Sequence, residues 1–128
     1  MDSPDAYELP AGAYLAYTSL EWITDSKKKA AAARQLAEMV PGFAPVWKEI
    51  AFLTDTDTER LEAIENGLAA NPDPETKGVL LTNKALALDR RGDHDLAVRL
   101  VQELLVDSQL PSGPEQMAKL IVSSLQGK

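Results

Sequence analysis

A match of the sequence to itself at an offset of about 34 residues is the feature that most constrains this fold. Large apolar residues or alanines coincide at that offset: Trp47 with Leu81, Ala51 with Ala85, and Ala63 with Ala97. One helix–turn–helix unit of a helical solenoid has this length. The period therefore predicts an array of paired helices, an architecture that usually provides a binding surface.

The composition also favours helices over strands. Of the 128 residues, 45% are hydrophobic and only 5% are aromatic, while Ala and Leu are plentiful. Ala and Leu are strong helix formers, whereas strands are rich in the β-branched and aromatic runs that are scarce here. We expect residues 1–128 to form a single all-α domain, because this length suits one compact core.

The charge and the absence of cysteine exclude several classes of function. A formal net charge of −7 and a pI near 4.6 argue against nucleic acid or an anionic membrane as the main partner. The basic groups Lys27-Lys28-Lys29 and Arg90-Arg91 are typical of solvated faces. Without Cys there is no disulfide, thiolate nucleophile or Cys-based metal site.

The ends of the chain and its hydropathy predict a cytoplasmic location. The acidic start, Met1-Asp2-Ser3-Pro4-Asp5, lacks the basic and apolar regions of a signal peptide. No segment approaches the roughly 20 apolar residues that a membrane span needs.

Prolines, capping residues and apolar spacing predict seven helices. Pro10, Pro45, Pro74 and Pro114 precede apolar-periodic stretches, where a first-turn Pro loses no hydrogen bond. The expected helices cover about 10–23, 26–39, 45–54, 58–70, 75–90, 94–107 and 114–125. Gly92 is expected to end the fifth in a left-handed conformation. Short connections make consecutive helices antiparallel neighbours, giving three pairs and a last helix that covers the final pair.

The repeated residues resemble the tetratricopeptide repeat. The unit over about 78–111 matches best, and it carries Leu81, Ala85, Leu88, Gly92-Asp93, Ala97 and Pro111. The unit over about 44–77 has the family's typical Trp at Trp47 and small residues at Ala51 and Ala63. The unit over about 10–43 fits least, with Ala13, Leu20 and Pro41 in place. A generic helical bundle is the structural alternative.

Several positions depart from the family pattern. The middle unit has Thr58 where the turn glycine is expected, and Gly67 where a large apolar residue is expected. In the first unit, Tyr17 and Lys29 stand where the family prefers small residues. The resemblance implies helix pairs stacked as a short right-handed superhelix.

The resemblance also implies a concave groove lined by the first helix of each pair. Transferred position by position, the partner-binding residues are Tyr14, Thr18, Trp22, Lys48, Phe52, Asp55, Thr82, Leu86, Asp89 and Arg90. Tyr14, Trp22 and Phe52 would act as apolar anchors, while Lys48, Asp89 and Arg90 would set polarity. The alternative is that Trp22 and Phe52 pack against neighbouring helices.

One subset of the family clamps the acidic C-terminal tails of chaperones with Lys, Asn and Arg. The matching positions here hold Tyr14, Thr18, Glu49, Val79 and Asn83. Only Asn83 is compatible with such a clamp, and Glu49 would repel a carboxylate. This kind of partner is therefore not expected.

Two clusters look like chemical sites but have simpler structural explanations. The run Asp55-Thr56-Asp57-Thr58-Glu59 offers oxygen ligands, yet a Ca²⁺ loop needs Gly and Glu where Arg60 and Asn66 stand. We expect it to cap a helix. The sole histidine, His94, lies between two aspartates at a turn, where it is expected to be exposed and Asp93 to cap the next helix.

The predicted function is a non-enzymatic protein–protein interaction module. No phosphate loop, nucleophile elbow or dinucleotide fingerprint appears, so neither a catalytic residue nor a cofactor is expected. Two alternatives remain open. The array is a self-associating or accessory domain of a larger assembly, with Met117, Leu120 and Ile121 of the last helix forming a possible homodimer contact. Otherwise it is a chaperone-like repeat protein for secreted substrates.

Overall fold

The computed structural model describes residues 12–127, and these residues form helices without strands. The elements are α1 (Ala13–Ser19), the 3-10 turn η1 (Leu20–Trp22), α2 (Ser26–Met39), α3 (Ala44–Leu53), α4 (Asp57–Ala69), α5 (Pro74–Arg90), α6 (His94–Leu105) and α7 (Ser112–Gln126). The prediction of seven helices in an all-α fold is confirmed over the described residues.

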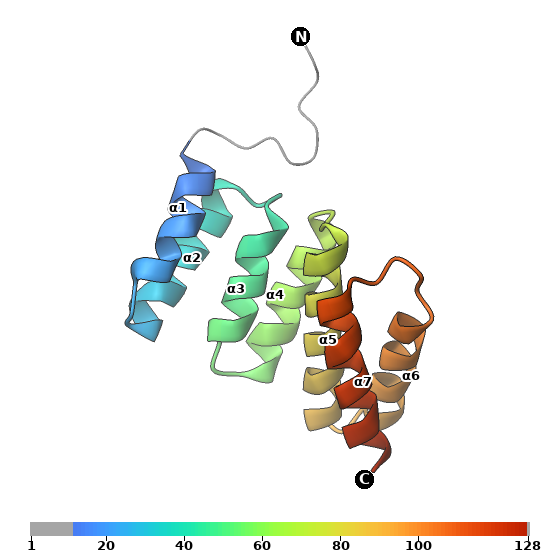
Figure 1. Cartoon of the computed structure of the whole chain (residues 1–128). Helices are drawn as coiled ribbons and strands as arrows, with labels where there is room; N and C mark the ends of the chain where they lie inside the picture. Colours follow the sequence, from blue (N-terminus) through green and yellow to red (C-terminus); the bar gives the residue numbers. More distant parts are fainter. Residues whose placement is uncertain (1–11, 128) are drawn as a thin grey trace.

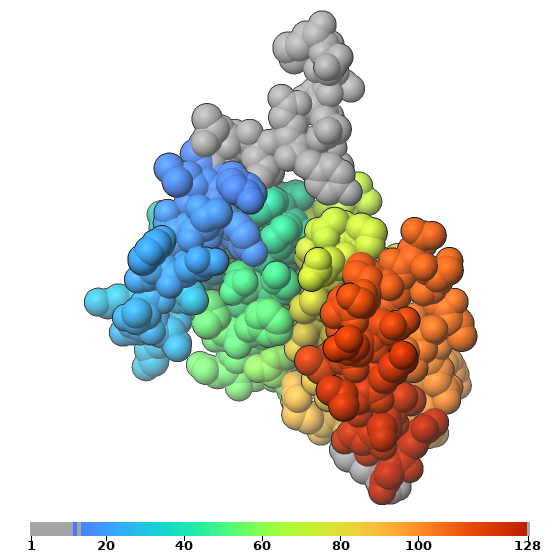
Figure 2. Space-filling view, viewed as in Figure 1, coloured from blue at the N-terminus to red at the C-terminus, as the bar shows by residue number. Residues whose placement is uncertain are grey.

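Consecutive helices pack side by side in a row (Figure 1). Alternate helices in the second half of the row also meet, since α3 contacts α5 and α5 contacts α7. This is the packing of a helical repeat array. α7 packs on both α5 and α6, and Figure 2 shows it, in red, lying over that end of the row. It covers the final pair as the sequence predicted.

Side-chain caps explain why several helices begin where they do. The carboxylate of Asp25 accepts the amides of Lys27 and Lys28 at 2.8 and 3.2 Å, and starts α2. Thr56 accepts the Glu59 amide at 3.1 Å and starts α4. Capping is therefore confirmed as the role of Thr56 in the Thr/Asp run.

Asp73 caps α5 by accepting the Thr76 amide at 3.1 Å. Burial raises the pKa of Asp73, but the hydroxyl and amide of Thr76 outweigh burial, so the pKa lies below its usual value. Gly92 ends α5 with φ +99°, which confirms the expected left-handed residue. Asp93 occupies the expected N-cap position of α6, but its carboxylate bonds Arg91 at 2.7 and 3.0 Å and makes no capping hydrogen bond.

The first helix is shorter than predicted. The single helix expected over 10–23 is a seven-residue α-helix followed by a 3-10 turn, and Pro10 lies outside the described residues. The hydroxyls of Thr18 and Ser19 both donate to the carbonyl of Leu15, at 3.0 and 2.7 Å. Such bonds compete with the helical backbone ladder, which accounts for its change at Leu20.

Alanines separated by the repeat period share one structural role. Ala51 and Ala63 are 1% and 3% exposed, and their equivalents Ala85 and Ala97 are both fully buried. The small residues allow the two helices of a pair to approach closely. The alanines that coincide in the self-match of the sequence are therefore buried at equivalent positions of successive helix pairs.

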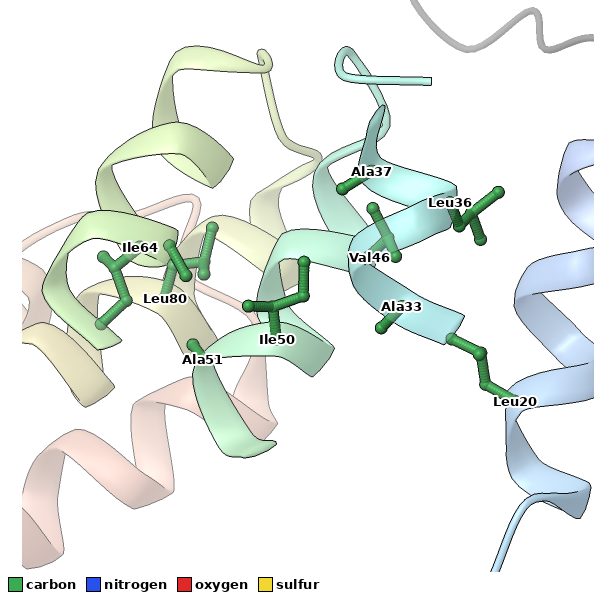
Figure 3. Packing of buried hydrophobic residues seen from close by; sticks show 10 residues of the cluster. Leu20, Ala33, Leu36, Ala37, Val46, Ile50, Ala51, Ile64 and Leu80 are labelled. Atoms are coloured by element: carbon green, nitrogen blue, oxygen red, sulfur yellow. The ribbon is translucent and has the colours of Figure 1, made fainter. Parts of the chain in front are cut away.

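The buried residues form two clusters that divide within α5. The first extends from Leu20 to Leu80, and Figure 3 shows Ile64 of α4 beside Leu80 of α5. The second begins at Ala85 and ends at Leu125 in α7. α5 is thus the element shared by both clusters.

The structure explains the two positions, Thr58 and Gly67, at which the middle unit departs from the family pattern. Thr58, aligned with Gly92, lies inside α4, because the turn is the extended stretch 54–56, placed earlier in the unit. Gly67 is buried, and a Cβ there would lie 2.9 Å from Leu80 Cδ1 and 3.0 Å from Trp47 Cβ. Trp47 and Leu80 therefore fill the space that a large residue would take.

Candidate functional site

A largely apolar groove lies between α3, α5 and α7, the first helices of two pairs and the closing helix. We call it the α3–α5–α7 groove. It has a volume of about 320 Å³ and is lined by Phe52, Glu75, Val79, Thr82, Asn83, Leu86, Gly113, Pro114 and Met117. This is large enough to receive a bulky side chain and part of its backbone.

The floor of the groove is one stripe of α5. Val79, Thr82, Asn83 and Leu86 recur at intervals of three and four residues, so they lie on one helical face. The Thr82 hydroxyl and the Asn83 amide nitrogen each donate to the Val79 carbonyl at 2.8 Å. These bonds satisfy polar donors within α5, leaving Val79 and Leu86 as apolar floor residues.

The walls come from α3 and α7. Phe52 on α3 is 50% exposed, and Met117 on α7 is 49% exposed. A partner that covers both of these half-exposed apolar side chains removes apolar area from water on two sides of one hollow, which stabilises the complex.

A glycine contact sets the width of the groove. A Cβ at Gly78 would lie 2.6 Å from Pro114 Cβ and 2.8 Å from its Cγ, so only glycine permits this approach of α7 to α5. Pro114 is buried at this contact. The proline ring thereby fixes the start of α7, and Met117 lies one turn further along.

Glu75 is the single charged residue among those lining the groove. It is exposed in the first turn of α5, and it forms no ion pair with the described residues. The rim is therefore acidic at this end.

Phe52, Thr82 and Leu86 are the predicted partner-binding residues that the structure brings together in this groove. Tyr14 and Trp22 lie on α1 and η1 and do not line it. They are 64% and 84% exposed, so the alternative in which Trp22 packs against a neighbouring helix is wrong.

Arg90 has a structural partner. Its guanidinium donates to the Asp57 carboxylate in three contacts of 2.9 to 3.1 Å, and Arg60 pairs with the same carboxylate. The hydrogen bond from Arg90 lowers the pKa of Asp57, and Arg60 adds to this. Arg60 also donates to the carbonyls of Ala51 and Thr54, at 3.0 and 2.9 Å. The cluster ties α4 to α5 and fixes the turn of the middle unit.

Asp89 also has a structural partner, the side chain of His94. Its Oδ1 lies 2.9 Å from His94 Nδ1, and its side chain is 10% exposed. The side chain of His94 is 40% exposed, so the turn histidine is exposed in part, as expected, and it is held by Asp89.

The remaining predicted positions are spread along the array. Thr18 donates its hydroxyl to Leu15 within α1, and Lys48 is half-buried on α3. Asp55 lines a separate hollow of about 320 Å³ beside the start of α2, together with Lys27 and Arg34.

The sequence analysis did not predict that α7 contributes residues to the groove. Pro114 and Met117 are spaced three apart, which places them on one helical face, but nothing in the repeat predicts which helix that face meets. Ile121 was expected at the surface and is 4% exposed within the second cluster.

No protein-family model, curated protein or solved structure matches this chain significantly. Within residues 12–127, no three His, Asp or Glu side chains gather closely enough to hold a metal ion. Over the same residues, no helix is long and apolar enough to cross a membrane.

Proposed function

We propose that this chain is a non-enzymatic protein–protein interaction module of the cytoplasm, a divergent tetratricopeptide array that holds a segment of a partner in the α3–α5–α7 groove. The observation that carries the proposal is the pair Phe52 and Met117, half exposed on either side of an apolar floor. Full burial of a large apolar side chain contributes about 1.5–3 kcal/mol, so covering each of these half-exposed side chains contributes about half of that.

The positions of the lining residues support the proposal. They belong to α3, α5 and α7, so the groove follows the face that a repeat array offers to its partners. Arg90 and Asp89 are removed from the set of contact residues, because Arg90 pairs with Asp57 and Asp89 pairs with His94. The anchoring set is Phe52, Leu86 and Met117.

Affinity capture from the source cells tests this function, with a matched pair of variants as bait. Phe52→Asp places a charge in the groove, whereas Met39→Asp places one at a 71% exposed methionine on α2. We expect mass spectrometry to find proteins that the wild type and Met39→Asp retain and Phe52→Asp loses. Equal capture by all three baits contradicts the proposal.

Self-association is a second candidate function, favoured by one observation. Leu120 on α7 is 68% exposed and adjoins Met117, so it offers an apolar contact to another copy or to a larger assembly. Ile121 has no part in such a contact, because it is buried. Sedimentation velocity of the wild type and Leu120→Glu distinguishes the two functions: a dimer that dissociates in the variant favours self-association, and a monomer in both favours the groove. A chaperone-like role for the array differs from the leading proposal only in the client bound.

A further inference from the structure

The charges around the groove indicate which kind of segment it binds. Glu75 is exposed at the rim, and within the described residues no cation pairs with it. Two cations were expected to contribute on this face: Arg90 is held by Asp57 through contacts of 2.9 to 3.1 Å, and Lys48 does not line the groove. The lining of the groove therefore carries one acid and no cation.

The net charge of the whole chain, like Glu75, favours a cationic partner. The net charge of −7 attracts a cationic segment from a distance and repels an acidic one. At contact, an exposed carboxylate beside an apolar surface selects the register in which a cation lies near the apolar anchor. Both effects favour a basic segment.

Resting on the proposed function, we propose that the α3–α5–α7 groove binds a basic, apolar peptide segment. A bulky apolar side chain of the partner enters between Phe52, Leu86 and Met117, and a Lys or Arg close to it in the segment pairs with Glu75. The partner is thus a protein with an exposed basic and apolar stretch.

Asp95 provides a matched control for Glu75. Each is an exposed acid at the second residue of its helix, Glu75 in α5 and Asp95 in α6. Replacing either by Lys makes the same change in net charge and loses the same interaction with the helix dipole. The two variants differ in that only Glu75 lines the groove.

The experiment selects a random dodecapeptide library displayed on phage against the wild-type chain, Glu75→Lys and Asp95→Lys. We expect the wild type and Asp95→Lys to enrich peptides with Leu, Met, Phe or Trp near a Lys or Arg. Glu75→Lys should lose that basic preference. In fluorescence polarisation at low salt, Glu75→Lys should weaken the best wild-type peptide by about tenfold, and Glu75→Gln by less.

The outcomes separate the charge inference from the function on which it rests. Peptides with an apolar anchor and no basic preference, or an equal loss in Glu75→Lys and Asp95→Lys, overturn the inference and leave groove binding standing. Enriched peptides that bind Phe52→Asp as well as the wild type overturn the groove function itself. If no peptide is enriched by the wild type, both are overturned.

Discussion

At the scale of single residues, two close helix contacts of this array, at Gly67 and Gly78, require glycine itself and not merely a small residue. Gly78 lies in the interior of α5, where glycine costs about 1 kcal/mol relative to alanine. Glycine is nevertheless needed at this position, because Pro114 occupies the space that the Cβ of any other residue would take. The identity of residue 78 is thus decided by a residue in a different helix.

Gly78→Ala is therefore expected to destabilise the fold despite the better helix propensity of alanine. Overpacking against the rigid proline ring costs about 1–3 kcal/mol, and alanine regains about 1 kcal/mol of helix propensity, so we expect a net loss of up to about 2 kcal/mol in the free energy of unfolding by urea. Gly113→Ala is the control, since nothing lies within 4 Å of a Cβ at that helical glycine. Equal midpoints for the two variants would show that Pro114 moves freely.

The small residues could be predicted from the sequence and these glycines could not. Ala51 and Ala85 recur at the repeat period, so their burial followed from spacing alone. At the same offset, Gly67 coincides with Ala33 and Gly78 with Ala44, so the period does not indicate a glycine at either position. Their roles depend on Trp47, Leu80 and Pro114, which touch them only after the helices have packed.

At the scale of elements, the α4–α5 connection depends on a hub of charges around Asp57. The carboxylate binds Arg60 of its own helix and Arg90 of the next. Because the pKa of Asp57 is lowered in the folded state, its contribution is fully present above the unfolded pKa of about 3.9. It is lost as the pH falls through the folded value.

Asp57→Asn should lower the free energy of unfolding by about 1 kcal/mol at neutral pH. The difference from the wild type should shrink as the pH falls below about 4, where the wild-type carboxylate also becomes protonated. Urea unfolding at a series of pH values measures this. Glu59→Gln is the control, because Glu59 and Arg34 are each about half exposed, and we expect little change. A pH-independent difference for Asp57→Asn would contradict the electrostatic explanation.

Helix boundaries were the most predictable feature of the elements, apart from the first helix. Capping residues and prolines are local signals, so six helices begin and end within about two residues of expectation. The first helix ends early because Thr18 and Ser19 bond back to Leu15, a competition that apolar spacing does not reveal.

At the scale of the whole molecule, the buried residues form two clusters. We therefore expect a substitution in one cluster to weaken that end of the array before the other. Ile121 belongs to the second cluster, whereas its neighbour Leu120 is 68% exposed. We expect Ile121→Ala to cost about 2–5 kcal/mol and Leu120→Ala to cost little. Hydrogen exchange should show the loss of protection in α6 and α7 before α2 and α3. A uniform loss along the array would contradict the division into two clusters.

Part of the lining of the α3–α5–α7 groove coincides with residues that the resemblance named. The resemblance located Phe52, Thr82 and Leu86, because their positions within each unit repeat. It also included Tyr14 and Trp22, which lie on α1 and η1, and these two elements pack against α2 rather than against the helices of the groove. Met117 comes from the closing helix, which carries no repeat signature, and so the sequence could not place it.

Methionine-methyl NMR tests the central claim most directly, because the chain has three methionines and two of them report on different faces. Met117 lines the α3–α5–α7 groove, and Met39 is exposed on α2, while Met1 lies outside the described residues. Titrating the ¹³C-methyl-labelled chain with a captured partner should shift the Met117 signal and leave Met39 unchanged. A shift of Met39 alone, or a bound partner that shifts neither signal, would contradict binding in the groove.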